Sequence, residues 1–192
     1  MSAITLNLSP VVRMNDDDFY NLCGANPDLK LERTARGELV VMPLAGGEGG
    51  KGEADLITDL NIWNRSDQSG VVFSSSTGFK LPSGADRSPD AAWVKLERWE
   101  ALTPQQRRKF PPLAPDFVIE LRSVTDELEA LQTKMQEYMD NRVQLGWLIN
   151  PQQRQVEIYR QGQPKQILNS PSSLSGEDVL PGFVLDLSRI FE

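Results

Sequence analysis

The chain has 192 residues, the composition of an ordinary globular protein and a formal net charge of -7. It contains no histidine and a single cysteine, Cys23, which excludes His-based triads, histidine general bases, nearly all zinc sites and any internal disulfide. The acidic charge disfavours polyanions unless a local basic groove or a metal ion offsets it. Catalysis would therefore rest on carboxylates, Lys, Arg, Ser or Tyr, with an oxygen-preferring cation as the expected metal.

The expected location follows from what the sequence lacks. No segment approaches the roughly 20 apolar residues of a membrane span, and the N-terminal MSAITLNLSP has neither the basic nor the apolar region of a signal peptide. One cysteine suits a reducing compartment. We expect a cytoplasmic protein without membrane association, folded as a single domain over 1–192, with 1–12 as a loose lead-in.

Hydrophobic periodicity and turn residues predict an α/β chain built on a mixed sheet. The expected elements, in chain order, are a helix over 16–27, a hairpin of strands 29–34 and 37–43, a flexible glycine-rich loop, a helix over 53–65, strands 70–82 and 87–95, a helix over 96–110 broken near Pro104, a central strand 116–123, a helix over 127–140 capped by Asp126, strands 143–150 and 154–161, and a last short strand with a helical turn.

The central strand DFVIELRS carries charge where burial is expected. Alternate residues of a strand share a face, so one face presents Phe117, Ile119 and Leu121 and the other Val118, Glu120 and Arg122. Buried charges need a partner or a function. A Glu120–Arg122 pair on a half-exposed face is the structural alternative to catalysis.

Lys134 lies on the helix that follows this strand. It comes three residues after Leu131 and four before Tyr138, so it flanks the apolar stripe and can reach toward the sheet. The alternative is a surface lysine whose aliphatic stem covers apolar area while its ammonium stays in water.

Asp90 in SPDAAWV stands at the start of an apolar strand, where an ionised carboxylate is costly to bury without a partner. Two carboxylates on adjacent strands, such as Asp90 and Glu120, can share one divalent cation that orients a phosphate and activates water. A nearby ammonium or guanidinium stabilises the transition state. This pattern predicts a metal-dependent phosphodiesterase that needs no histidine.

These motifs resemble the PD-(D/E)XK nucleases and, more closely, the bacterial family described as putative restriction endonucleases. The resemblance spans roughly residues 30 to 160 and rests on RSPDAAWV, PDFVIELRS, the positions of Lys134 and Tyr138, and GWLINPQQRQVEIYR. It implies a restriction-endonuclease-like fold, in which a central mixed β-sheet is flanked by helices and the active site lies at one end of the sheet. An N-terminal helix and hairpin would be additions to that fold.

The resemblance also implies an endonuclease that hydrolyses DNA phosphodiester bonds with Mg2+ or Mn2+. Asp90 and Glu120 would be its metal ligands, and Arg122 and Lys134 would lie near the scissile phosphate. Arg122 stands where the pattern has lysine, and Arg is a poor proton acceptor, so Lys134 could supply the missing ammonium. Glu48 could be an auxiliary acid, with an exposed loop residue as the alternative.

Other functions stay open at the level of sequence. The acidic charge and the missing motif lysine also suit a catalytically inactive binding or regulatory module with the same fold. A structural or oligomerising protein is a weaker reading. We expect a homodimer, as is typical of nucleases that cut both strands, although no sequence feature specifies one. The basic run 107–109 could touch phosphates or simply end a helix.

Overall fold

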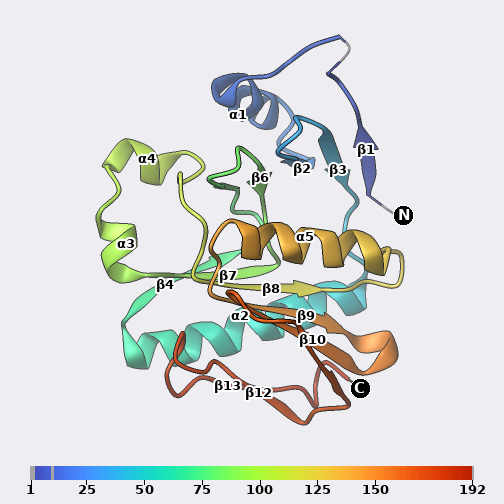
Figure 1. Ribbon diagram of the computed structural model, residues 1–192, viewed down its shortest axis with the longest axis vertical. Coiled ribbons are helices and arrows are strands. Elements are labelled where there is room, and N and C mark those ends of the chain that lie inside the picture. Colours follow the sequence, from blue (N-terminus) through green and yellow to red (C-terminus); the bar gives the residue numbers. More distant parts are fainter. Residues whose placement is uncertain (1–2, 10, 192) are drawn as a thin grey trace.

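The computed structural model describes residues 3–9 and 11–191 (Figure 1). The helices are α1 (Asp16–Ala25), α2 (Gly47–Asp67), α3 (Leu96–Glu100), α4 (Pro104–Arg108), α5 (Leu128–Asp140) and the 3-10 helix η1 (Pro151–Gln153). The strands are β1 (Ile4–Leu6), β2 (Lys30–Arg33), β3 (Leu39–Met42), β4 (Gly70–Ser74), β5 (Phe79–Lys80), β6 (Asp86–Arg87), β7 (Ala91–Lys95), β8 (Phe117–Leu121), β9 (Leu145–Asn150), β10 (Gln155–Arg160), β11 (Gln166–Asn169), β12 (Ser173–Ser175) and β13 (Val184–Asp186).

The largest sheet is mixed and has the strand order β11-β10-β9-β8-β7-β4. Strands β8 and β9 are parallel and are joined by α5, whereas the other neighbours in this sheet are antiparallel. The expected central strand is thus at the middle of the sheet, where both of its faces are covered. The prediction of an α/β fold with a central mixed sheet flanked by helices is confirmed.

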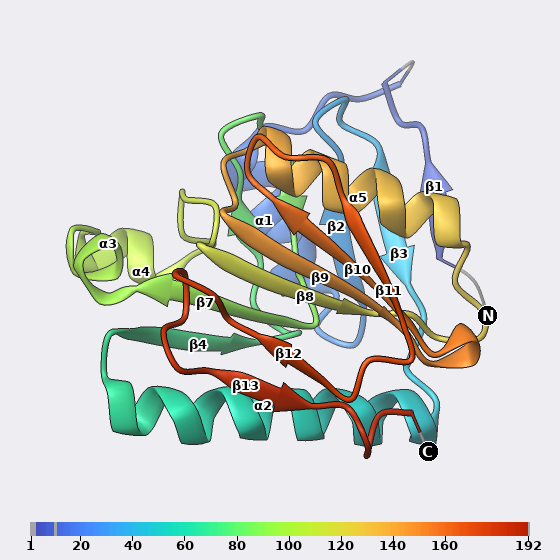
Figure 2. The same cartoon turned by 60° about the horizontal axis from the view of Figure 1, so that its bottom comes forward.

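Two helices cover the two faces of this sheet, α5 on one side and α2 on the other (Figures 1 and 2). On the α2 side the hydrophobic core includes Leu56, Leu60, Trp93, Phe117 and Trp147, together with side chains of the C-terminal segment. On the α5 side it includes Ala92, Val118, Met135, Tyr138 and Leu148. The alternation read from DFVIELRS therefore places Glu120 on the α5 side.

A second sheet, with the order β1-β3-β2-β6-β5, packs beside the first and carries α1 next to β2. Its strands β2 and β3 form the expected hairpin. Residues 4–6, which fall in the expected loose lead-in, instead form the edge strand β1 and pair with β3 from Ile4↔Val41 to Leu6↔Leu39. Alternating Ile4 and Leu6 suit a strand that a neighbouring ladder can recruit.

The two long strands expected over 70–82 and 87–95 are each divided between the two sheets. Their outer parts, β4 and β7, pair in the large sheet, and their inner parts, β5 and β6, pair in the small one. The expectation of two continuous strands was wrong because a bend at residues 75–78 and at Ser88–Asp90 redirects the chain. That bend brings the small sheet against the end of the large one.

Two helices also begin differently from what the sequence predicts. Helix α2 begins inside the glycine cluster, at Gly47, where a flexible loop was expected. A Cβ on Gly52 would lie 2.8 Å from the Leu121 side chain, so glycine allows α2 to pack closely on the end of β8. Helix α5 is preceded by Glu127 as N-cap, and the carboxylate of Asp126 accepts from the Ser123 N–H instead of capping the helix.

No helix within residues 3–9 and 11–191 combines the length and the apolar character needed to cross a lipid bilayer.

Candidate active site

Asp90 and Glu120 lie side by side at one end of β8. Because β7 and β8 are antiparallel with Ala91 opposite Ile119, Asp90 lies beside Glu120 at the next position of the ladder. Oδ2 of Asp90 accepts the backbone N–H of Leu121 at 2.8 Å. The bend before β7 thus fixes Asp90 next to the backbone that carries Glu120.

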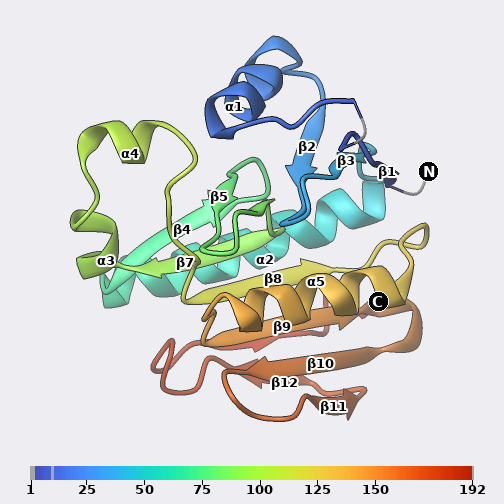
Figure 3. The same cartoon turned by 45° about the horizontal axis from the view of Figure 1, so that its top comes forward.

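Lys134 comes to the same place from α5, which lies across β8 and β9 (Figure 3). Its side chain is only 8% exposed, and its Nζ lies 2.8 Å from Oε1 of Glu120 and 2.9 Å from Oε1 of Glu32. It also approaches the backbone carbonyl of Ser88 at 3.4 Å. The prediction that Lys134 turns toward the sheet is therefore correct, and the alternative of a surface lysine is not.

Glu120 is buried and shares its Oε1 between two donors, the Lys134 ammonium and the Tyr138 hydroxyl at 2.9 Å. Neither contact uses Oε2. Burial is the main cause that raises the pKa of Glu120 to about 7. The negative charges of Asp90 and Glu32 also raise this pKa, whereas the Lys134 ammonium lowers it. Ionisation of Glu120 is therefore costly here, and a cation bound beside it would reduce that cost.

The cations of the site remain charged. Burial disfavours the charged form of Lys134, but the neighbouring carboxylates Glu120 and Glu32 hold its pKa above the ordinary value for lysine. A second lysine, Lys30 on β2, lies 3.5 Å from Oδ1 of Asp90, with both side chains partly exposed. An ammonium thus faces each of the two carboxylates at the end of β8.

Glu32 is a buried member of this cluster that the sequence reading missed. Besides Lys134, it binds Arg87, whose Nη1 lies 3.0 Å from Oε2 of Glu32. In the sequence it belongs to an unremarkable hairpin, KLERTARGEL. The available signal was the alternation of the predicted strand 29–34, which puts the charged Lys30 and Glu32 on one face.

Arg122 and Glu48 are placed differently from the other predicted residues. Arg122 follows the end of β8, and its Nε donates to the carbonyl of Asp126 at 3.1 Å, while Glu120 pairs with Lys134. Glu120 and Arg122 therefore do not form the ion pair that was the structural alternative. Glu48 is exposed in the first turn of α2, where its charge complements the helix dipole.

The donor set fits a hard divalent cation with an incomplete protein shell. Among residues 3–9 and 11–191 there is no group of three or more Asp, Glu, His or Cys residues that could hold a metal ion. Mg2+ commonly uses one or two carboxylates and takes its other ligands from water and substrate phosphates. Asp90 and Glu120 can supply the two carboxylates, with the partly exposed Asp90 on the open side.

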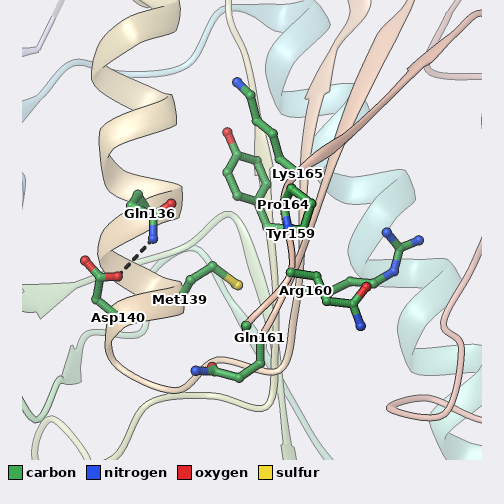
Figure 4. Close-up of a pocket in the computed structure, with 10 residues that line it drawn as sticks. Gln136, Met139, Asp140, Tyr159, Arg160, Gln161, Pro164 and Lys165 are labelled. Carbon is green, nitrogen blue, oxygen red and sulfur yellow. Dashed lines mark hydrogen bonds between the residues drawn. The ribbon is translucent and has the colours of Figure 1, made fainter.

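A pocket of about 410 Å³ lies elsewhere, between the C-terminal half of α5 and the segment that joins β10 to β11 (Figure 4). Gln136 and Asp140 line its helical wall and are hydrogen-bonded to each other. Tyr159 and Lys165 line the opposite wall. None of the lining residues belongs to the cluster around Glu120, so the pocket gives no support to a catalytic reading.

The comparisons with known proteins bear on the family and the fold of the chain. A search of the curated proteins found no match. Among solved structures, a putative nuclease belonging to DUF820 from Anabaena variabilis is similar, with a TM-score of 0.75 and 18% identity over 91% of this chain and 96% of that one. At this identity the match establishes a shared fold. The family model described as "Putative restriction endonuclease" matches residues 16–188, and the chain therefore belongs to that family and has its restriction-endonuclease-like fold.

Proposed function

We propose that the protein is a Mg2+- or Mn2+-dependent endonuclease that hydrolyses DNA phosphodiester bonds. The observation that carries the proposal is the convergence of Asp90, Glu120 and the buried Lys134 ammonium from three separate elements at one end of β8. Membership of the family supplies the reaction class. The sequence contains no histidine that could serve as a general base in a different hydrolytic mechanism.

In this proposal each residue has a defined task. Asp90 and Glu120 hold the divalent ion, which when bound orients the scissile phosphate and makes water a better nucleophile. Lys134, charged and fixed beside Glu120, stabilises negative charge that develops on the phosphate oxygens. Arg122 can bind a flanking phosphate, but a guanidinium is a poor proton acceptor.

The proposal is tested by cleavage of supercoiled plasmid and of single-stranded oligonucleotides with Mg2+, with Mn2+ and with EDTA. We expect metal-dependent cleavage by the unchanged protein and a loss of at least about a hundredfold in Asp90→Asn. Asp140→Asn is the matched control, because Asp140 is an exposed aspartate at the end of α5 that is bound only by Gln136 among the contacts described. Equal rates for the unchanged protein and Asp90→Asn would reject the nuclease.

A second candidate is an inactive module that binds nucleic acid with the same fold. The observation that favours it is that Lys134 already lies between Glu120 and Glu32, within 3.0 Å of both, as a structural ion pair would. This reading predicts DNA binding that is unaffected by EDTA, together with no rise in melting temperature on adding Mn2+. A metal-induced rise that Glu120→Gln removes would exclude it.

A further inference from the structure

Glu32 is almost inaccessible to solvent, and both of its carboxylate oxygens accept hydrogen bonds from neighbouring groups. Oε1 accepts the Ser88 N–H and the Lys134 ammonium, each at 2.9 Å. Oε2 binds the Arg87 guanidinium at 3.0 Å. Burial alone would raise the pKa of Glu32, but Lys134 and Arg87 lower it to about 2, so the side chain is ionised at neutral pH.

The partner on the far side of Glu32 is itself held in place. The Nε of Arg87 donates to the carboxylate of Glu137, which lies three residues after Lys134 on α5. Arg87 on β6 and Glu32 on β2 therefore form a bridge from the small sheet back to the helix that carries Lys134. Such a bridge of alternating charges limits the movement of Glu32 relative to α5.

Lys134 has three N–H donors and three acceptors around it. These acceptors are Oε1 of Glu120 at 2.8 Å, Oε1 of Glu32 at 2.9 Å and the carbonyl of Ser88 at 3.4 Å. A flexible lysine side chain bound by Glu120 alone would still rotate about that contact. Glu32 and Ser88 remove that freedom, and Ser88 belongs to the same bend as Asp90.

We propose that Glu32 is a positioning residue, which fixes the Lys134 ammonium beside Glu120 while Arg87 and the Ser88 N–H hold Glu32 in turn. The inference rests on the proposed function for its consequence in catalysis. A role as a third metal ligand does not suit Glu32, because its two oxygens already accept from Ser88, Lys134 and Arg87. Glu32 acts through Lys134, in contrast to Asp90, which would bind the ion directly.

The first test does not depend on cleavage. A buried ammonium with three acceptors exchanges slowly, so the Lys134 side-chain ¹⁵N–¹H signal should be observed by NMR in the unchanged protein. We expect Glu32→Gln to shift and broaden it, Glu32→Asp to retain it, and Glu157→Gln to leave it unchanged. Glu157 is an equally buried glutamate that pairs with Lys165. A Lys134 signal unaltered in Glu32→Gln would overturn the proposal.

The second test measures cleavage and metal binding. Glu32→Gln should lower kcat by about 10- to 100-fold and change KM by less than about threefold, while Glu32→Asp recovers part of the rate. In a Lys134→Gln background the added Glu32→Gln should cost less than about twofold, because coupled residues are not additive. An equal cost in both backgrounds would mean that Glu32 does not act through Lys134.

Metal binding separates positioning from ligation. The rise in melting temperature caused by Mn2+ should persist in Glu32→Gln and disappear in Asp90→Asn. Loss in Glu32→Gln as complete as in Asp90→Asn would make Glu32 a ligand and overturn the proposal. If the unchanged protein neither cuts nor responds to metal, the nuclease proposal fails, and the NMR result still decides whether Glu32 fixes Lys134.

Discussion

Two buried glutamates on the α5 side of the large sheet make an instructive comparison. Glu120 on β8 and Glu157 on β10 both lie opposite Leu148 of the intervening strand β9, so they stand in one row across the sheet. Each is 3% exposed. Each also accepts from a tyrosine and a lysine: Tyr138 and Lys134 for Glu120, Tyr159 and Lys165 for Glu157.

Their pKa values nevertheless move in opposite directions. Burial would raise the pKa of Glu157, but hydrogen bonds from Tyr159, Lys165 and Gln132 lower it below the ordinary value. Burial and then the charges of Asp90 and Glu32 raise the pKa of Glu120 to about 7, and Lys134 lowers it without cancelling these effects. Glu157 is thus a satisfied structural carboxylate, whereas Glu120 is buried near two further carboxylates and is costly to ionise, so that a bound cation would stabilise its charge.

The largest expected effect on stability is that of Lys134→Met, compared with Lys165→Met at the other glutamate. Lys134→Met leaves Glu120 and Glu32 short of a buried counter-charge, and we expect it to reduce the free energy of unfolding by about 3 kcal/mol at neutral pH. Lys165→Met removes a partner that is 37% exposed, and exposed pairs contribute no more than about 1 kcal/mol. Urea denaturation of both variants measures the difference, and equal losses would erase the contrast between the two sites.

The second prediction compares the glutamates themselves. Glu120→Gln should lower metal-dependent cleavage at least about a hundredfold and abolish the Mn2+-induced rise in melting temperature. Glu157→Gln should change cleavage by less than about threefold, since its partners Gln132, Tyr159 and Lys165 form no described hydrogen bond or ion pair with the cluster around Glu120. A comparable loss of cleavage in both variants would show that both glutamates affect cleavage through the structure of the sheet and that Glu120 has no separate catalytic role.

Part of this contrast was predictable from the sequence, because it depends on local periodicity. The alternation of DFVIELRS placed Glu120 on a buried face, and the spacing of Lys134 from Leu131 and Tyr138 turned it toward the sheet. The motif Ser-Pro-Asp marked Asp90 at the start of an apolar strand, although the bend at this point was not predicted. Strong periodic segments near one another in the chain therefore carried most of the site.

The contribution of Glu32 was not predictable, because it depends on a contact between distant segments. Arg33 pairs with Asp86 across β2 and β6, and this single register position brings Glu32 to Arg87 and Ser88. The sequence pattern predicted one strand over 87–95, and such a strand would have kept Arg87 in the large sheet. Long-range pairing between short strands leaves almost no local pattern.

The third prediction concerns the pH dependence that Glu32 gives to stability. Its pKa is about 2 in the folded protein and 4.5 in the unfolded chain, so its contribution is present above pH 4.5 and is lost as the pH falls toward 2. The excess stability of the unchanged protein over Glu32→Gln should therefore shrink by about 2 kcal/mol between pH 7 and pH 3.

Urea denaturation at several pH values checks this, with Glu38→Gln as the control for a partly exposed, paired glutamate of the same hairpin. A difference between the unchanged protein and Glu32→Gln that stays constant across this range would contradict an ionised, ion-paired Glu32.

The smallest expected effect is at the two tyrosines, and it tests the charge of each glutamate directly. A hydrogen bond to an ionised group contributes about 1.5–3 kcal/mol, against about 1 kcal/mol for a neutral one. Tyr159→Phe removes a hydroxyl that donates at 2.5 Å to the ionised Glu157, so it should cost about 1.5 kcal/mol at pH 7. Tyr138→Phe removes a donor to Glu120, whose pKa is about 7, so it should cost about 1 kcal/mol or less at pH 6. Its cost should then grow from pH 6 to pH 8 as Glu120 ionises, while that of Tyr159→Phe stays constant. Identical pH profiles for the two variants would mean that the two glutamates are in the same charge state, and the raised pKa assigned to Glu120 would be wrong.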